Sequence, residues 1–175
     1  MKTKLPLVIF FGLLILLAIG LTRNPQALPS PLINKPAPEL MLPDLFNGTQ
    51  QTSAEWQGQP WVLTVWASWC GTCVQEHQVL HQLKHTQPTL RLVGLDYKDE
   101  TTSAQDWLKQ HGNPFDHIVV DAQGASAIDW GVYGVPETFV MDKHNIIRHK
   151  ITGALTTNSL QQEILPLLQT LTQEQ

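Results

Sequence analysis

The feature that most constrains the fold is an apolar run that leads directly into two closely spaced cysteines. Residues 61–66 read Trp-Val-Leu-Thr-Val-Trp, and Cys70 and Cys73 follow shortly after. An unbroken run of β-branched and aromatic residues is typical of a strand buried on both faces of a sheet. Residues 70–84 have a helical pattern, and residues 90–95 are expected to form a second buried strand. The sequence therefore predicts a β-α-β unit with parallel strands and with Cys70 at the start of its helix.

The rest of the chain predicts further strands and helices around this unit. A hairpin is expected where residues 40–45 and 50–53 flank an Asn47-Gly48 turn signal. Later patterns predict helices at 102–111 and 125–130 and strands at 118–120, 138–141 and 146–151. A final helix is expected over 158–170, interrupted by Pro166. These elements predict one α/β domain over residues 39–175.

The N-terminal residues predict a membrane anchor and a linker. No charged residue occurs from Leu5 to Thr22, a stretch of 18 residues, which is near the lower length limit for a membrane helix. Basic residues before it favour a cytoplasmic N-terminus and an exported C-terminal domain. We therefore expect an anchor at 1–22 and a proline-rich linker at 23–38. A cleaved signal peptide ending near Ala18 is the alternative.

Charge and cysteine content exclude some classes of function. The chain has a formal net charge of −4, and three of its basic residues flank the N-terminal apolar segment, so the remainder is more acidic. This acidity argues against a nucleic-acid partner. Two cysteines three positions apart are too close to form the framework of a disulfide-stapled domain. They are either a catalytic pair or part of a metal site.

The position of the pair favours redox chemistry. At a helix N-terminus, free N–H groups and the helix dipole stabilise a thiolate, which makes Cys70 the candidate nucleophile. Cys73 lies one turn further in and can attack the mixed disulfide to release the product. The alternatives are a static disulfide, zinc, or a copper or heme chaperone that uses Cys70, Cys73 and His77. Because His77, His81 and His85 lie in a glutamine-rich helix, we interpret them as a solvated face.

A second motif precedes the predicted strand at 138–141. Residues 131–139 read Gly-Val-Tyr-Gly-Val-Pro-Glu-Thr-Phe, so Pro136 stands where a strand begins, a position that tolerates proline. Together with residues 65–73, Val-Trp-Ala-Ser-Trp-Cys-Gly-Thr-Cys, this motif resembles the CcmG/DsbE family of thioredoxin-like reductases. The resemblance covers nearly the whole chain. It implies a thioredoxin-like fold, a central mixed sheet flanked by helices, with an N-terminal extension and a central insert at 112–130.

The resemblance also implies roles for residues around the cysteines. It makes Pro136 a cis-proline that packs against the disulfide, and it makes the backbone of Val135 a pairing site for an extended substrate segment. Besides these two, the expected positioning residues are Trp69, Gly71, Thr72 and Glu137. Gly71 departs from the family, in which proline is frequent, and the residues between the cysteines help to set the reduction potential.

The acid–base chemistry of the pair is expected to differ from that of typical thioredoxins. Thr64 occupies the position of their buried aspartate, so the usual proton acceptor is missing. Glu76 follows Cys73 by three residues on the same helical face, where burial would raise its pKa and let it accept the Cys73 proton. Glu137 is expected to tune the same thiols or to select the partner. For either glutamate, a solvated surface charge is the alternative.

The function implied by the resemblance is reduction of the heme-attachment cysteines of apocytochrome c in the periplasm. The enzyme would need no bound cofactor and would be re-reduced by a membrane thiol-disulfide donor of the DsbD/CcdA type, beside the cytochrome c maturation machinery. An exported compartment is oxidising, so such a reductant must receive electrons continuously. A general periplasmic oxidant or isomerase is the alternative enzyme.

Overall fold

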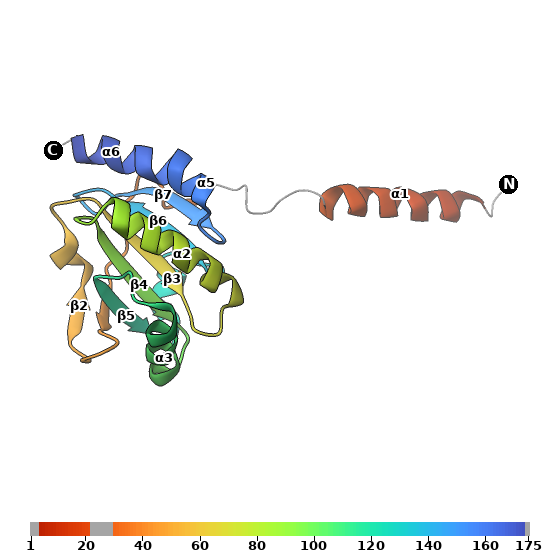
Figure 1. Ribbon diagram of the computed structural model, residues 1–175. Coiled ribbons are helices and arrows are strands. Elements are labelled where there is room, and N and C mark those ends of the chain that lie inside the picture. The colour runs from red at the N-terminus through yellow and green to blue at the C-terminus, as the bar shows by residue number, and fades with distance from the viewer. Residues whose placement is uncertain (1–3, 22–29, 174–175) are drawn as a thin grey trace.

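The computed structural model describes residues 4–21 and 30–173 (Figure 1). Its strands are β1 (Met41–Pro43), β2 (Gln50–Thr52), β3 (Trp61–Trp66), β4 (Arg91–Tyr97), β5 (His117–Asp121), β6 (Glu137–Met141) and β7 (Ile147–Thr152). Its helices are α1 (Lys4–Leu21), the 3-10 helix η2 (Ser53–Trp56), α2 (Gly71–Thr86), α3 (Thr101–His111), α4 (Ala125–Asp129), α5 (Thr157–Ser159), the π-helix η3 (Leu160–Ile164) and α6 (Leu165–Gln173). The predicted strands and helices of the domain are confirmed to within a few residues.

Five strands form a mixed sheet in the order β5-β4-β3-β6-β7. The strands β3 and β4 are parallel, as predicted, with Trp61 opposite Arg91 and Trp66 opposite Asp96. The strand β5 is parallel to β4, whereas β6 and β7 are antiparallel to their neighbours. The expected insert at 112–130 therefore contributes an edge strand, β5, as well as α4.

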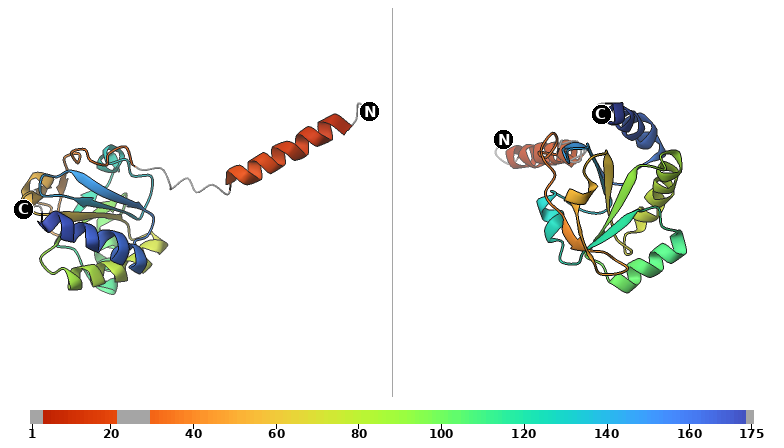
Figure 2. Two further views of the ribbon diagram at one scale, coloured as in Figure 1. Left: turned by 90° about the horizontal axis from the view of Figure 1, so that it is seen from above. Right: turned by 90° about the vertical axis from the view of Figure 1, so that its left-hand side faces the viewer.

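The sheet separates two apolar layers. Figure 2 shows α2, α3 and α6 on one face, and the β1–β2 hairpin with α4 on the other. Because neighbouring residues of a strand point to opposite faces, Val62 and Trp66 pack beneath α2 and α3, whereas Leu63 and Val65 belong to the second layer. All six residues of β3 are buried, as expected for a central strand.

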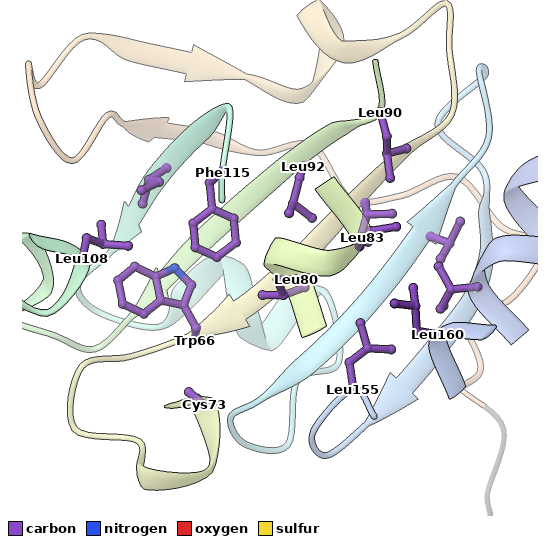
Figure 3. Packing of buried hydrophobic residues seen from close by; sticks show 14 of the residues in the cluster. Trp66, Cys73, Leu80, Leu83, Leu90, Leu92, Leu108, Phe115, Leu155 and Leu160 are labelled. Atoms are coloured by element: carbon purple, nitrogen blue, oxygen red, sulfur yellow. The ribbon is translucent and has the colours of Figure 1, made fainter. Parts of the chain in front are cut away.

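Trp66 fills the first layer next to the cysteines (Figure 3). Its ring stacks on Phe115, with ring centroids 5.8 Å apart, and lies 5.0 Å from the ring of Trp107. Gly94, in the neighbouring strand, makes room for it, because a Cβ atom there would lie 2.8 Å from the indole nitrogen. The indole therefore packs in the same apolar cluster as Cys70 and supports the segment that carries it.

The packed region begins earlier than the predicted residue 39. The N–H groups of Asn34 and Ala37 donate to the carbonyls of Ile147 and Asn145, and Ile147 N–H donates to Lys35. The last part of the proline-rich segment is therefore hydrogen-bonded to β7 and to the turn before it. The earlier part, at 22–29, lies outside the described residues.

The C-terminal helix continues through Pro166, but its regular α-helical geometry is interrupted just before this residue by a π-helical segment. The helix begins with a capping box of Thr156 and Ser159 and changes to π-helical geometry over η3, where Leu165 N–H donates to Leu160. A proline ring clashes with the preceding turn of a regular α-helix, and a wider π-turn relieves such crowding. The helical direction is therefore kept.

The N-terminal helix α1 lies apart from the domain (Figure 1). Its described side chains from Leu7 to Leu17 are exposed. Judged on the fully described residues, no helix combines the length and the apolar character that a membrane crossing requires. The uncharged run at 5–22 extends beyond those residues.

Candidate active site

Cys70 and Cys73 form a disulfide at the first turn of α2. Cys70 is the N-cap residue, with extended backbone angles, and its Sγ accepts a hydrogen bond of 3.2 Å from the N–H of Cys73. Both cysteines are buried, whereas Gly71 and Thr72 between them are exposed. A donor at the helix N-terminus that already points at Cys70 Sγ would also stabilise a thiolate there.

The segment before Cys70 is held by the loop that follows β4. The carboxylate of Asp99 accepts hydrogen bonds from both the N–H and the hydroxyl of Ser68. The indole of Trp69 donates to the carbonyl of Lys98 over 3.0 Å, while the residue remains 58% exposed. The segment that leads to the disulfide is thus held in place by hydrogen bonds, and the Trp69 ring offers a flat apolar surface next to Cys70.

The second motif forms a turn next to the same apolar layer. The Val135–Pro136 peptide bond is cis, as the family resemblance implies, and Pro136 is buried. Val135 packs against the cluster that contains Cys70 and Cys73. It precedes β6, so its backbone lies outside the ladder that begins where Val65 pairs with Glu137.

Glu76 is buried beneath the sheet, with 1% of its surface exposed. Its Oε1 accepts a hydrogen bond of 2.9 Å from the hydroxyl of Thr138, which in turn lies 3.5 Å from the hydroxyl of Thr64. Burial raises the pKa of Glu76 from 4.5 to about 7, although the bonds to Thr138 and to the Leu155 backbone oppose this rise. The expected raised pKa is confirmed, and the interpretation of Glu76 as a solvated charge is wrong.

A second buried carboxyl, which the sequence analysis missed, lies at the end of β4. Asp96 is fully buried opposite Trp66, and within the described chain its oxygens have no partner other than the carboxyl of Asp99. Burial, the charge of Asp99 and a hydrogen bond shared with it raise the pKa of Asp96 to about 8. Asp99, whose carboxylate holds Ser68, therefore shares a hydrogen bond with Asp96, which keeps its proton at neutral pH.

Glu137 is also buried, so a solvated position is wrong for this residue as well. Its Oε2 lies 2.9 Å from the Nζ of Lys150, and its Oε1 accepts a hydrogen bond from the N–H of Tyr133. Lys150 had no predicted role. It follows Arg148 and His149 in β7, and a run of such residues does not reveal a buried partner.

His77 is buried, which contradicts its assignment to a solvated face. Its ring lies between α2 and α3, with Nε2 2.8 Å from the carbonyl of Gly112 and the ring centroid 4.6 Å from that of Trp107. Burial, together with the charges of His81 and His111, lowers the pKa of His77 to about 4. Over residues 4–21 and 30–173, no group of three histidine, cysteine or carboxylate side chains is placed to hold a metal ion.

The fold and the cysteine pair define a thioredoxin-like thiol:disulfide oxidoreductase. Residues 32–164 match the family model described as Redoxin. The chain is 40% identical to the thiol:disulfide interchange protein DsbE of Haemophilus influenzae, with all of both chains covered. It is 42% identical to the DsbE of Escherichia coli K12, with 95% of each chain covered. The chain belongs to the DsbE family of thiol:disulfide interchange proteins.

A solved structure supports the same family. The crystal structure described as a thiol:disulfide interchange protein DsbE from Chlorobium tepidum superposes with a TM-score of 0.70 and 26% identity. The match covers 78% of this chain and 97% of that one. The likeness therefore extends over most of this chain and nearly all of the other.

Proposed function

We propose that the protein reduces the paired cysteines of the heme-attachment site of apocytochrome c during cytochrome c maturation. The observation that carries this proposal is the Cys70–Cys73 pair at the start of α2, in a chain that matches DsbE proteins over its full length. A buried carboxyl and a cis-proline turn beside the same apolar layer support it. These groups supply a proton acceptor and a place for an extended polypeptide.

In the proposed reaction, the reduced enzyme passes two electrons to a substrate disulfide. The Cys70 thiolate attacks one substrate sulfur, the substrate S–S bond breaks, and the released sulfur takes a proton. Cys73 then attacks Cys70 Sγ in the mixed disulfide and displaces the second substrate thiol. The substrate leaves as a dithiol, and the enzyme holds the Cys70–Cys73 disulfide that the structure contains.

Glu76 is proposed to accept the Cys73 proton in the second step. It lies one turn beyond Cys73 on α2, where side chains three positions apart are neighbours. A carboxyl with a pKa of about 7 is partly ionised at neutral pH and is a competent general base for a thiol. Thr138 orients it through the hydrogen bond to Oε1.

The substrate is proposed to bind along the turn before Pro136. The backbone of Val135 can add a strand-like pairing to an extended segment, because it lies outside the β3–β6 ladder. Trp69 offers an exposed apolar rim, and Gly71 and Thr72 leave the approach to Cys70 open. Glu137 supports the turn from below.

The N-terminal segment is proposed to anchor the enzyme in the inner membrane, with the domain in the periplasm. The uncharged run at 5–22, the basic residues before it and the exposed apolar side chains of α1 support this placement. Residues 1–22 would then form the anchor and 39–175 the working domain. A membrane donor of the DsbD/CcdA type would restore the dithiol.

The reduction potential of the Cys70–Cys73 couple tests the direction of electron flow. The full-length protein in mild detergent is equilibrated in graded thiol-disulfide buffers, and its free cysteines are counted by alkylation and mass. A potential between about −200 and −270 mV, the range of glutaredoxins and thioredoxin, is expected. A potential near −120 mV, as in a strong oxidant, would contradict the reductase and favour a general oxidant.

Substrate choice is tested with disulfide-bonded peptides. A peptide with a Cys-Xaa-Xaa-Cys-His sequence is compared with a peptide of the same composition in which the residues around the cysteines are shuffled. The reduced enzyme is expected to react faster with the first peptide. Equal rates would contradict a dedicated apocytochrome reductant and leave a general disulfide reductase.

A further inference from the structure

A buried ion pair lies behind the turn that leads to Pro136. The Nζ atom of Lys150 is 2.9 Å from Oε2 of Glu137, and the two side chains are 4% and 1% exposed. Removing two charges from water costs more than their mutual attraction returns, unless further hydrogen bonds satisfy both groups. A pair of this kind is therefore a weak contributor to stability, and its other partners indicate what it does.

Those partners are in the loop before the cis peptide bond. The second carboxylate oxygen of Glu137 accepts a hydrogen bond of 3.1 Å from the N–H of Tyr133. The ammonium group of Lys150 donates to the carbonyl of Gly131 over 2.7 Å. Each member of the pair thus holds one backbone group of the same short loop.

Lys150 also lies beneath an aromatic ring of that loop. Its Nζ is 4.8 Å from the ring centroid of Tyr133 and 5.1 Å from that of Phe139. A cation close to the face of an aromatic ring attracts the ring and restricts where it can lie. Tyr133 itself is 83% exposed, so the ring is held from below and open to solvent above.

The other contacts of the loop lie at its ends and at Val135, which packs against the apolar core, while the carbonyl of Pro136 accepts a hydrogen bond from the N–H of Gly153. Residues 131–136 belong to no strand, Gly131 has a positive φ of 61°, and a Cβ on Gly134 would meet open space. The hydrogen bonds to α4 end at Val132, whose N–H donates to Ala127. Between these contacts, the N–H of Tyr133 is held by Glu137, so the ion pair helps to position the exposed part of the loop at Tyr133 and Gly134.

We propose that Lys150 is a positioning residue for exchange with polypeptide substrates: paired with Glu137, it holds the 131–135 loop so that the Tyr133 ring and the Val135 backbone meet the segment that carries the target disulfide. The inference rests on the proposed binding of substrate at Val135 and Pro136. It assigns the ion pair to recognition of the polypeptide, leaving the chemistry of the cysteines to other groups.

The test compares a polypeptide disulfide with a small one. The double variant Glu137→Gln/Lys150→Met removes both charges together, so neither is left buried alone. Its matched control is Asp106→Asn/Lys109→Met, which removes an ion pair of 2.7 Å whose side chains are more than 70% exposed on α3. Initial rates of the reduced full-length proteins are measured with each of the two disulfide peptides above and with oxidised glutathione.

The double variant is expected to raise KM for both peptides about tenfold, with a smaller change in kcat, because the loss is one of binding. The rate with oxidised glutathione and the equilibrium constant of the couple with glutathione should stay within about twofold of the wild type. The control should match the wild type in every measurement. Equal losses with peptides and glutathione, or no change in the peptide KM, would overturn the proposal.

Two further variants keep the test decisive if the double variant does not fold. Tyr133→Ala changes an exposed ring and should raise the peptide KM severalfold, with unchanged glutathione kinetics. Lys150→Arg keeps the positive charge and a hydrogen-bond donor, so its peptide KM should be closer to the wild-type value than that of the double variant, which lacks both charges. A wild-type KM in Tyr133→Ala would overturn the proposal. If the enzyme merely fails to distinguish the two peptides, the apocytochrome proposal fails and this one stands.

Discussion

The fully buried Asp96 is expected to make the protein less stable as the pH rises. Its pKa is 3.8 in an exposed aspartate and about 8 here, because burial and the neighbouring Asp99 disfavour its charge. Below pH 3.8 the carboxyl is protonated in both the folded and the unfolded chain, so its contribution is fully favourable. Between pH 3.8 and about pH 8, only the folded chain keeps the proton, so the free energy of unfolding decreases as the pH rises. Above about pH 8 the loss is complete.

The size of the effect follows from the shift. One pKa unit corresponds to about 1.4 kcal/mol, so the loss amounts to at most about 5 kcal/mol between pH 4 and pH 9. Asp96→Asn keeps the shape of the neutral carboxyl and cannot ionise. Its free energy of unfolding should equal that of the wild type near pH 4 and exceed it by about 3 to 5 kcal/mol at pH 9.

The assay is urea unfolding of the oxidised full-length proteins in non-ionic detergent at each pH from 4 to 9. The difference between the two proteins is the informative quantity, because Glu76, whose pKa is about 7, lowers stability over the same range in both. Asp129→Asn, which makes the same substitution on the exposed side of α4, is the control. Parallel stability curves for the wild type and Asp96→Asn would refute the reasoning.

Three predictions concern the chemistry at the cysteines. Cys73→Ser should accumulate a mixed disulfide between Cys70 and a substrate peptide, visible by mass, whereas Cys70→Ser should not, since it lacks the attacking thiol. Glu76→Gln should slow the resolution of that mixed disulfide by Cys73 about 100-fold at pH 8. In the wild type, stopped-flow measurements should show this rate rising as the pH passes 7, and the variant should lack that rise. An unchanged pH profile would argue against Glu76 as the base. Thr138→Val removes a hydrogen bond that lowers the pKa of Glu76, so the midpoint of that rise should move to higher pH; a midpoint that stays or falls would contradict this role.

Local patterns in the sequence were sufficient to predict the scaffold of the site. The run at 61–66 became β3 with the predicted bounds, and the cysteine pair opens α2 as expected. The Asn47-Gly48 turn joins β1 and β2. In each case the deciding interactions lie within a few residues, so periodicity and turn chemistry suffice.

The sequence predicted the position of Glu76 better than that of His77. Both lie on α2 one turn or more after Cys73, and their spacing alone could not separate a buried face from a solvated one. Glu76 was expected to be desolvated because it shares the face of Cys73. His77 was assigned to solvent, but the packing of α3 against α2 covers it with Trp107 and Gly112.

By itself, the sequence determined the order of strands and helices, the cysteine pair at a helix start and the family resemblance that implied the cis bond before Pro136. The tertiary structure alone decided which charges are buried together. Asp96 meets Asp99 through the turn after β4, and Lys150 meets Glu137 because β6 and β7 pair antiparallel with Lys150 opposite Phe139, two residues along β6 from Glu137. A carboxyl or ammonium group has the same sequence signature in water and in a core. Its burial, pKa and partner depend on chain segments that local patterns do not bring together.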